Sequence, residues 1–139
     1  MKINQQEVDR LIDILATKIL ASKREFKWVV GIANGGLNIS VPLAQKLDLP
    51  HHAIRISWYD GHNQRKKPLI EGALIEDTGN LIVDDLIDGG KTIHTFDQYF
   101  GLEGNAVAVL YWNVLSSVKP DYYVEIKPNS WLVFPWSKE

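Results

Sequence analysis

The segment from 81 to 92 constrains the fold of this 139-residue chain more than any other part of it. Residues 81–83 are apolar and read as a buried strand, and the next five residues, 84–88, contain three aspartates. A glycine pair then leads into 91–100, where we expect a helix. A strand that turns sharply into a helix is the repeating unit of α/β domains, so the segment predicts that fold class.

The rest of the chain shows the same alternation of strands and helices. Apolar residues recur at helical spacing near the N-terminus. The expected helices cover 4–22, about 37–47 and 91–100, and the expected strands cover 28–32, 53–57, 80–83 and 106–112, with short extended pieces at 122–126 and 131–134. This alternation predicts a single domain over 1–139, with a mainly parallel central sheet flanked by helices.

A polar stretch at 59–79 interrupts the pattern and contains three glycines and Pro68. Long loops in compact domains are often functional, so this stretch is a candidate functional loop. The middle of the stretch can also form a hairpin arm. His51-His52 precedes the second strand, where we expect a surface turn, and the four histidines show no metal-binding spacing.

Composition excludes several classes of protein. With no cysteine, the chain has no disulfide scaffold, thiolate metal site or cysteine nucleophile. A net charge of −2 gives no basic surplus for nucleic-acid binding, although a local basic patch remains compatible with it. No apolar run is long enough to cross a bilayer, and the N-terminus lacks a signal-peptide core. We therefore expect a cytoplasmic protein without membrane insertion.

The residues that follow the strand at 80–83 predict a binding site. Residues after parallel strands meet at the edge of the sheet where ligands bind, and this places Asp84 and Asp85 there, with Asp88 one turn later. Three carboxylates so close together repel one another, and such clusters usually hold a cation or sugar hydroxyls. The glycine pair permits close approach and positive φ. The free N–H groups at a helix start attract phosphate, and the Thr92 hydroxyl can add a hydrogen bond.

Three other interpretations fit the sequence less well. An acidic pair alone is more often a solvated turn before a capped helix, but the complete run favours a binding site. Gly90-Lys91-Thr92 looks like the end of a nucleotide-binding P-loop, which requires a glycine where this chain has Asp85. Residues 31–36 lack the G-x-G-x-x-G spacing of a dinucleotide-binding fingerprint.

From about 28 to 136 the sequence resembles the type I phosphoribosyltransferases, most closely the bacterial xanthine-guanine branch. The matching segments are 82–88, which is the most specific, 57–60 with 63–65, 121–124, Trp131 and Pro135-Trp136. The resemblance implies the type I phosphoribosyltransferase fold. That fold has a flexible loop, here about 59–79, and a small C-terminal hood that holds the base, here about 113–139.

The resemblance also implies an activity and a cofactor. The 5-phosphoribosyl group would pass from phosphoribosyl pyrophosphate to a purine-like base of the guanine, xanthine or hypoxanthine type, with release of pyrophosphate in purine salvage. Asp84 and Asp85 would contact the ribose hydroxyls and Mg²⁺, and Asp88 would accept a proton near the purine N7, which makes these three the expected catalytic residues. The other expected contacts to phosphoribosyl pyrophosphate are Asn34, Gly35, Gly36, Gly89, Gly90, Lys91 and Thr92.

The same resemblance assigns the base pocket and the loop. The base would lie against Asn113, Trp131 and Leu132. The loop that closes over the site would contain Ser57, Tyr59 and Arg65, while Trp136 is expected to be a packing residue. A homodimer or homotetramer is implied.

Three residues depart from the pattern of the family. Asn34 stands where arginine is usual in the pyrophosphate loop. Either pyrophosphate binding is weaker than in the family, or the basic side chains of 65–67 supply the missing positive charge. Lys91 replaces a glycine and either assists the phosphate or points outward. Asn113 stands where a lysine recognises the 6-oxo group. The alternatives are therefore a non-catalytic or regulatory protein that binds phosphoribosyl pyrophosphate or a nucleotide, a transferase for a non-standard base, or a phosphoribosyl hydrolase.

Overall fold

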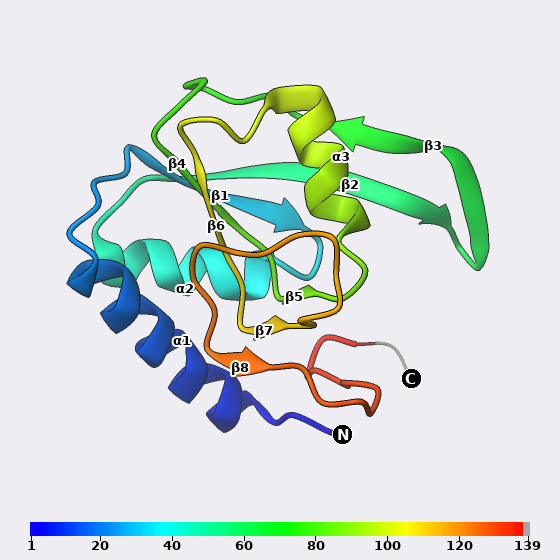
Figure 1. Cartoon of the computed structure of the whole chain (residues 1–139), viewed down its shortest axis with the longest axis horizontal. Coiled ribbons are helices and arrows are strands. Elements are labelled where there is room, and N and C mark those ends of the chain that lie inside the picture. Colours follow the sequence, from blue (N-terminus) through cyan, green and yellow to red (C-terminus); the bar gives the residue numbers. More distant parts are fainter. Residues whose placement is uncertain (138–139) are drawn as a thin grey trace.

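The apolar segments of the chain pair as strands in the computed structural model, which describes residues 1–137 (Figure 1). Its elements are α1 (Gln5–Ala21), β1 (Trp28–Ala33), α2 (Leu37–Leu47), β2 (His51–Asp60), β3 (Asn63–Glu71), β4 (Asn80–Val83), β5 (Leu86–Ile87), α3 (Lys91–Phe100), β6 (Ala106–Ala108), β7 (Tyr111–Trp112) and β8 (Glu125–Ile126). The expected domain and its C-terminal segment run to 139, so their last two positions lie outside the described residues.

The main sheet has the strand order β3-β2-β1-β4-β6. The pairs β1–β2, β1–β4 and β4–β6 are parallel, and β3 pairs antiparallel with β2 at one edge. The chain leaves β1 toward β2 on one side and later returns to place β4 on the other side of β1. The order of the strands therefore reverses between β1 and β4, which is where open α/β sheets bind ligands.

Helices cover both faces of this sheet, and the strands are apolar on both faces for that reason. Val29, Leu81 and Val83 pack in one core cluster with α1 and α2. Val30 and Ile82 point to the other face and pack with Phe96 of α3 in a second cluster. A parallel sheet flanked by helices, as the sequence predicts, is confirmed.

Most of the expected elements lie where the sequence places them. The first helix begins after Asn4, whose side chain accepts a hydrogen bond of 2.8 Å from the Glu7 N–H, as a helix N-cap does. The strand expected at 106–112 is divided, since β6 belongs to the main sheet and β7 to a small sheet of order β5-β7-β8. Of the two short extended pieces, 122–126 contributes β8 and 131–134 contributes an isolated bridge between Lys2 and Val133.

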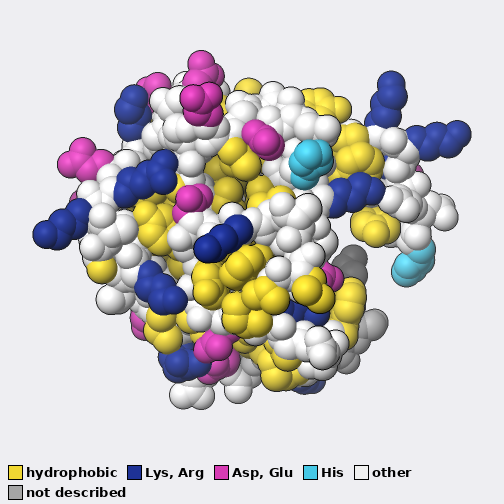
Figure 2. Space-filling model, in the orientation of Figure 1, with side chains coloured by type: hydrophobic (Ala, Val, Ile, Leu, Met, Phe, Trp, Pro, Cys, Tyr) yellow, Lys and Arg dark blue, Asp and Glu magenta, His cyan; other side chains and the backbone are white. Residues whose placement is uncertain are grey.

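The polar stretch 59–79 forms a hairpin in its middle. The prediction of a loop through the whole stretch is wrong for 63–71, because these residues form β3 and pair with β2. Figure 1 shows the two strands projecting from the body of the molecule, and Figure 2 shows Lys and Arg side chains gathered on this projection. The hairpin alternative is therefore confirmed. The surface turn expected at His51-His52 is wrong, because both residues belong to β2.

The C-terminal segment folds back onto the N-terminus. The Ile3 N–H donates to the Val133 carbonyl at 2.8 Å, and the Val133 N–H donates to the Met1 carbonyl at 2.9 Å. These bonds anchor 131–137 beside the small sheet, close to the ends of the parallel strands (Figure 1). None of the helices within 1–137 has the length and apolar character required to cross a bilayer.

The half-buried His51 makes a prediction about stability. Its Nε2 lies 2.8 Å from Ser40 Oγ, and burial, followed by the neighbouring His52, lowers the pKa of His51 below its usual value. The unfolded chain then takes up this proton more readily than the folded chain, so the free energy of unfolding falls as the pH drops below about 6.5. Between about pH 7.5 and about pH 5.5, the melting temperature of His51→Gln should fall less than that of the wild type. Circular dichroism measures both melting temperatures. His62→Gln, at the exposed hairpin turn, is the control, and equal behaviour of the two variants would contradict the prediction.

Candidate active site

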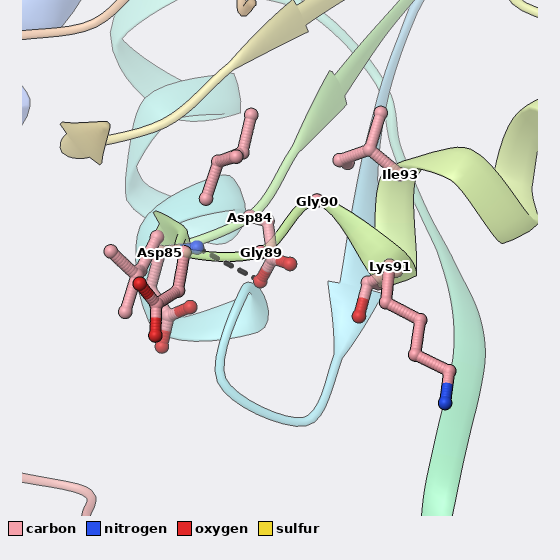
Figure 3. Close-up of a pocket in the computed structure, with 10 residues that line it drawn as sticks. Asp84, Asp85, Gly89, Gly90, Lys91 and Ile93 are labelled. Carbon is pink, nitrogen blue, oxygen red and sulfur yellow. Dashed lines mark hydrogen bonds between the residues drawn. The ribbon is translucent and has the colours of Figure 1, made fainter. Parts of the chain in front are cut away.

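The residues expected to bind the ribose and phosphates lie where β1 and β4 end side by side. Residues 34–36 follow β1, and Asp84 and Asp85 follow β4. A cavity of about 260 Å³ lies at this edge of the sheet and is lined by the continuous segment 84–93 (Figure 3). One strand end, one turn and the start of one helix therefore form the wall of the cavity.

The acidic pair is held by its own backbone and by the neighbouring strands. The Asp85 N–H donates to Asp84 Oδ1 at 2.9 Å, which is the dashed line in Figure 3. The Asp85 carbonyl accepts from the N–H groups of Leu110 and Tyr111. Burial of the Asp84 carboxyl, and then the nearby Asp85 carboxylate, raises the pKa of Asp84 well above its usual value. The pair resists carrying two negative charges unless a cation or hydroxyl groups compensate them.

Asp88 and Asn113 are brought together by the small sheet. Strand β5 pairs in parallel with β7, so Ile87 lies beside Trp112, and the residues that follow them are neighbours. The Asn113 Nδ2 donates to Asp88 Oδ1 at 3.0 Å, and the Leu115 N–H donates to Asn113 Oδ1 at 3.0 Å. The carboxamide oxygen is thus engaged by backbone, and its nitrogen faces the carboxylate.

The turn at 89–92 delivers the start of α3 to the cavity. Gly90 has φ of 90°, a left-handed conformation that favours glycine, whereas Gly89 does not use this freedom. No side chain caps α3, and its first turn begins with Lys91 and Thr92 at the cavity wall. N–H groups in the first turn of a helix are suited to bind an anion.

The Lys91 side chain contacts the β2–β3 hairpin rather than the acidic pair. In Figure 3 it points away from the two carboxylates, and its Nζ lies 3.9 Å from the centre of the Trp58 ring, a cation–π contact. The Trp58 Nε1–H donates to Thr95 Oγ1 at 2.9 Å. Lys91 and Trp58 together join the beginning of α3 to the β2–β3 hairpin.

The glycine turn after β1 packs tightly against the acidic pair. A Cβ at Gly35 would lie 2.5 Å from Asp85 Oδ2, and one at Gly36 would lie 2.7 Å from the Val83 carbonyl oxygen. Neither position tolerates a side chain without movement of its neighbours. The peptide bond between Ala33 and Asn34 is cis. The structure therefore brings 34–36 together with Asp85, as expected for parts of one site.

The three loop residues form a hydrogen-bonded group at the irregularity in β2. The Ser57 hydroxyl donates to the Tyr59 carbonyl at 2.9 Å, and the Arg65 Nε–H donates to the same carbonyl at 3.3 Å. The register of the β2–β3 pair shifts between Ser57 and Tyr59. These residues lie on the hairpin and line no part of the cavity at 84–93.

The expected base-binding residues of the C-terminal segment differ in exposure. The Trp131 side chain is 76% exposed, whereas Leu132 is 5% exposed and packs in the core with α1 and α2. A base could meet the Trp131 ring at the surface, but the Leu132 side chain faces the interior. Their roles in base binding stay predictions.

The acidic residues suit a hard cation that arrives with its substrate. Residues 1–137 contain no preformed group of three or more His, Cys, Asp or Glu side chains that could hold a metal. At phosphate-handling sites, Mg²⁺ usually binds one or two carboxylates together with substrate oxygens and water. The carboxylates of Asp84 and Asp85 are oxygen donors of this kind, so the residues present fit Mg²⁺.

Two contacts near the site had no local signal in the sequence. Trp136, expected to be a packing residue, donates from its Nε1–H to Asp85 Oδ2 at 3.1 Å across 51 positions of sequence. Trp58 reaches Thr95 across 37 positions. The match of Pro135-Trp136 to the family was the one available indication for Trp136.

Comparison with known proteins agrees with this geometry. Residues 2–137 match the phosphoribosyl transferase domain family. The fold is similar to a purine phosphoribosyltransferase from Pyrococcus horikoshii Ot3, with a TM-score of 0.82 and 33% identity over 100% of this chain and 95% of that one.

More distant structures share the fold. A Helicobacter pylori xanthine-guanine-hypoxanthine phosphoribosyltransferase has a TM-score of 0.79 and 17% identity, over 98% of this chain and 93% of that one. A Neisseria gonorrhoeae hypothetical protein with bound ppGpp has a TM-score of 0.72 and 22% identity, over 99% and 90%. Because the family match covers nearly all of the described chain and the archaeal relative is 33% identical, this protein belongs to the type I phosphoribosyltransferase family.

Proposed function

We propose that this protein transfers the 5-phosphoribosyl group from phosphoribosyl pyrophosphate to a 6-oxopurine-like base and releases pyrophosphate, as a purine salvage enzyme. The observation that carries the proposal is the continuous cavity wall 84–93 with Asn113 hydrogen-bonded to Asp88 at its side. The residues proposed to bind ribose phosphate then adjoin the Asp88–Asn113 pair, which is proposed to contact the base. The archaeal relative, described as a purine phosphoribosyltransferase, supports the same substrate class.

The ribose-phosphate half would use the acidic pair and the start of α3. The N–H groups of the first turn of α3 would hold the 5′-phosphate, and Asp84 and Asp85 would accept hydrogen bonds from the ribose hydroxyls. As the bond from the anomeric carbon to pyrophosphate breaks, positive charge develops on the ribose, and nearby carboxylates stabilise it. Mg²⁺, when bound, would neutralise charge on the pyrophosphate leaving group.

The base half would use Asp88 and Asn113. The base attacks the anomeric carbon through a ring nitrogen, and the proton released from the base would pass to the Asp88 carboxylate. Since the Asn113 oxygen accepts from the Leu115 N–H, the amide presents N–H toward the site. An N–H donor pairs with a 6-oxo group and meets the exocyclic amine of adenine as donor against donor.

Assembly and location are further parts of the proposal. We expect a cytoplasmic homodimer or homotetramer that binds phosphoribosyl pyrophosphate and a nucleobase. Equilibrium ultracentrifugation at micromolar protein should show a mass above that of the 15.8 kDa chain. A monomer at every concentration would contradict the proposed homodimer or homotetramer.

A non-catalytic binding protein is the second candidate, because Asn34 supplies no positive charge beside the expected pyrophosphate position. The two functions differ in turnover. Binding of phosphoribosyl pyrophosphate without pyrophosphate release under any base would favour the second candidate. Release without a base would instead indicate hydrolysis.

Pyrophosphate release tests the proposed reaction. We expect release from phosphoribosyl pyrophosphate and Mg²⁺ to require hypoxanthine, guanine or xanthine. The double variant Asp84→Asn with Asp85→Asn should lower kcat/KM by about 10²-fold or more, because it removes the charges that stabilise the developing cation. Asp9→Asn with Asp13→Asn removes the same number of charges from the exposed face of α1 and serves as the control. Full activity of the first double variant would refute the site.

Substitution of Asn113 tests how the base is recognised. Asn113→Asp removes the N–H donor and places a second carboxylate against Asp88, so kcat/KM for hypoxanthine should fall about 10- to 100-fold. Asn113→Lys keeps a donor and should retain activity with hypoxanthine. The wild type should discriminate against adenine. If adenine and hypoxanthine react equally well in the wild type, the assigned role of Asn113 is wrong.

A further inference from the structure

The C-terminal turn at 134–137 reaches the acidic pair through one side chain. The Nε1–H of Trp136 donates to Asp85 Oδ2 at 3.1 Å, and both side chains are partly buried. The same carboxylate oxygen lies against the glycine turn, since a Cβ at Gly35 would be 2.5 Å from it and 3.5 Å from the Trp136 Nε1. Oδ2 is therefore enclosed between an indole and a backbone turn.

Several contacts hold the indole where it meets Asp85. The Trp136 ring stacks on the Phe134 ring with centroids 4.8 Å apart and planes at 5°, and Phe134 packs edge-on against Tyr111. The turn itself is closed by two bonds, from the Phe134 N–H to Ser137 Oγ and from the Ser137 N–H to the Phe134 carbonyl, both 3.0 Å. The hydrogen bonds of Val133 to the N-terminal residues also fix the segment that precedes the turn, so the backbone that carries the indole is held in place.

The contact orients the Asp85 carboxylate. An aspartate side chain has two torsions, and an exposed one would rotate freely at the cavity rim. The Asp85 backbone is fixed by Leu110 and Tyr111, and Trp136 fixes the far end of the side chain. With Oδ2 engaged by the indole, the carboxylate is held in one orientation at the wall of the cavity.

We infer that Trp136 is a positioning residue, which holds the Asp85 carboxylate in the orientation that binds the ribose of phosphoribosyl pyrophosphate and its Mg²⁺. The inference rests on the proposed function for the identity of that ligand. It gives the C-terminal turn a role in the ribose-phosphate half of the site. Stacking of Trp136 on the base, or packing alone, would have different consequences.

Trp136→Phe is the variant that separates these roles. It keeps a ring to stack on Phe134 and removes the N–H donor. Loss of a hydrogen bond to a charged group should raise KM for phosphoribosyl pyrophosphate about tenfold, while KM for hypoxanthine stays within about twofold. The matched control is Trp28→Phe, which alters a tryptophan at the opposite end of β1, where it pairs with Asn80. This control should change neither constant.

A spectroscopic readout tests the contact without activity. The five indole N–H resonances of isotope-labelled protein can be followed by heteronuclear NMR, and Trp136→Phe identifies the one from Trp136. Asp85→Asn should shift that resonance, because a charged acceptor is replaced by a neutral amide. Asp88→Asn should leave it in place. A Trp136 resonance indifferent to Asp85→Asn would overturn the inference.

Calorimetric titration of phosphoribosyl pyrophosphate with Mg²⁺ into the wild type and Trp136→Phe completes the test. Weaker binding by the variant, with an unchanged melting temperature, supports positioning. Unchanged binding and KM, an equal rise in KM for the base, or the same effect from Trp28→Phe would each refute it. If the wild type neither binds phosphoribosyl pyrophosphate nor releases pyrophosphate, the proposed function itself fails, and the inference fails with it.

Discussion

The parallel pairing of β1 with β4 is the constraint on which the site depends. These neighbours end at the same edge of the sheet, but β1 continues toward α2 and β4 toward α3 on the opposite face. The chain therefore leaves the two strand ends toward opposite faces of the sheet. The turn after β1 contributes a glycine backbone, and the turn after β4 contributes carboxylates. Because these glycines have no side chain, the turn after β1 can lie close against the Asp85 carboxylate.

The local parts of this arrangement could be predicted from the sequence, because each is encoded in a short segment. The run 81–92 contains a strand, an acidic turn and a helix start in order, and the helical spacing of apolar residues predicts α1. The hairpin of β2 and β3 is encoded more weakly, since β3 is largely polar and has no buried residue to produce an alternating pattern. Similarly, 106–112 reads as one strand, and its division between two sheets depends on partners elsewhere in the chain.

The contacts that shape the site could not be predicted in the same way. Asn113 meets Asp88 because β5 and β7 pair, and Trp136 meets Asp85 because 131–137 is anchored to the N-terminus. Neither β5 nor β7 is longer than two residues, which is too short for periodicity to identify. Lys91 shows the same limit, since its outward direction was one of two alternatives and its contact with Trp58 required the hairpin to be in place.

The three aspartates of the motif have different environments despite their proximity in sequence. Burial and the neighbouring Asp85 charge raise the pKa of Asp84 above its usual value. Asp85 has an indole donor on one oxygen, and Asp88 is exposed with an amide donor from Asn113. A motif of three identical side chains thus yields three different acceptors, and the partners that differentiate two of them come from the C-terminal third of the chain. Variation in that third can therefore alter how the carboxylates after β4 are oriented, without any change in the acidic motif itself.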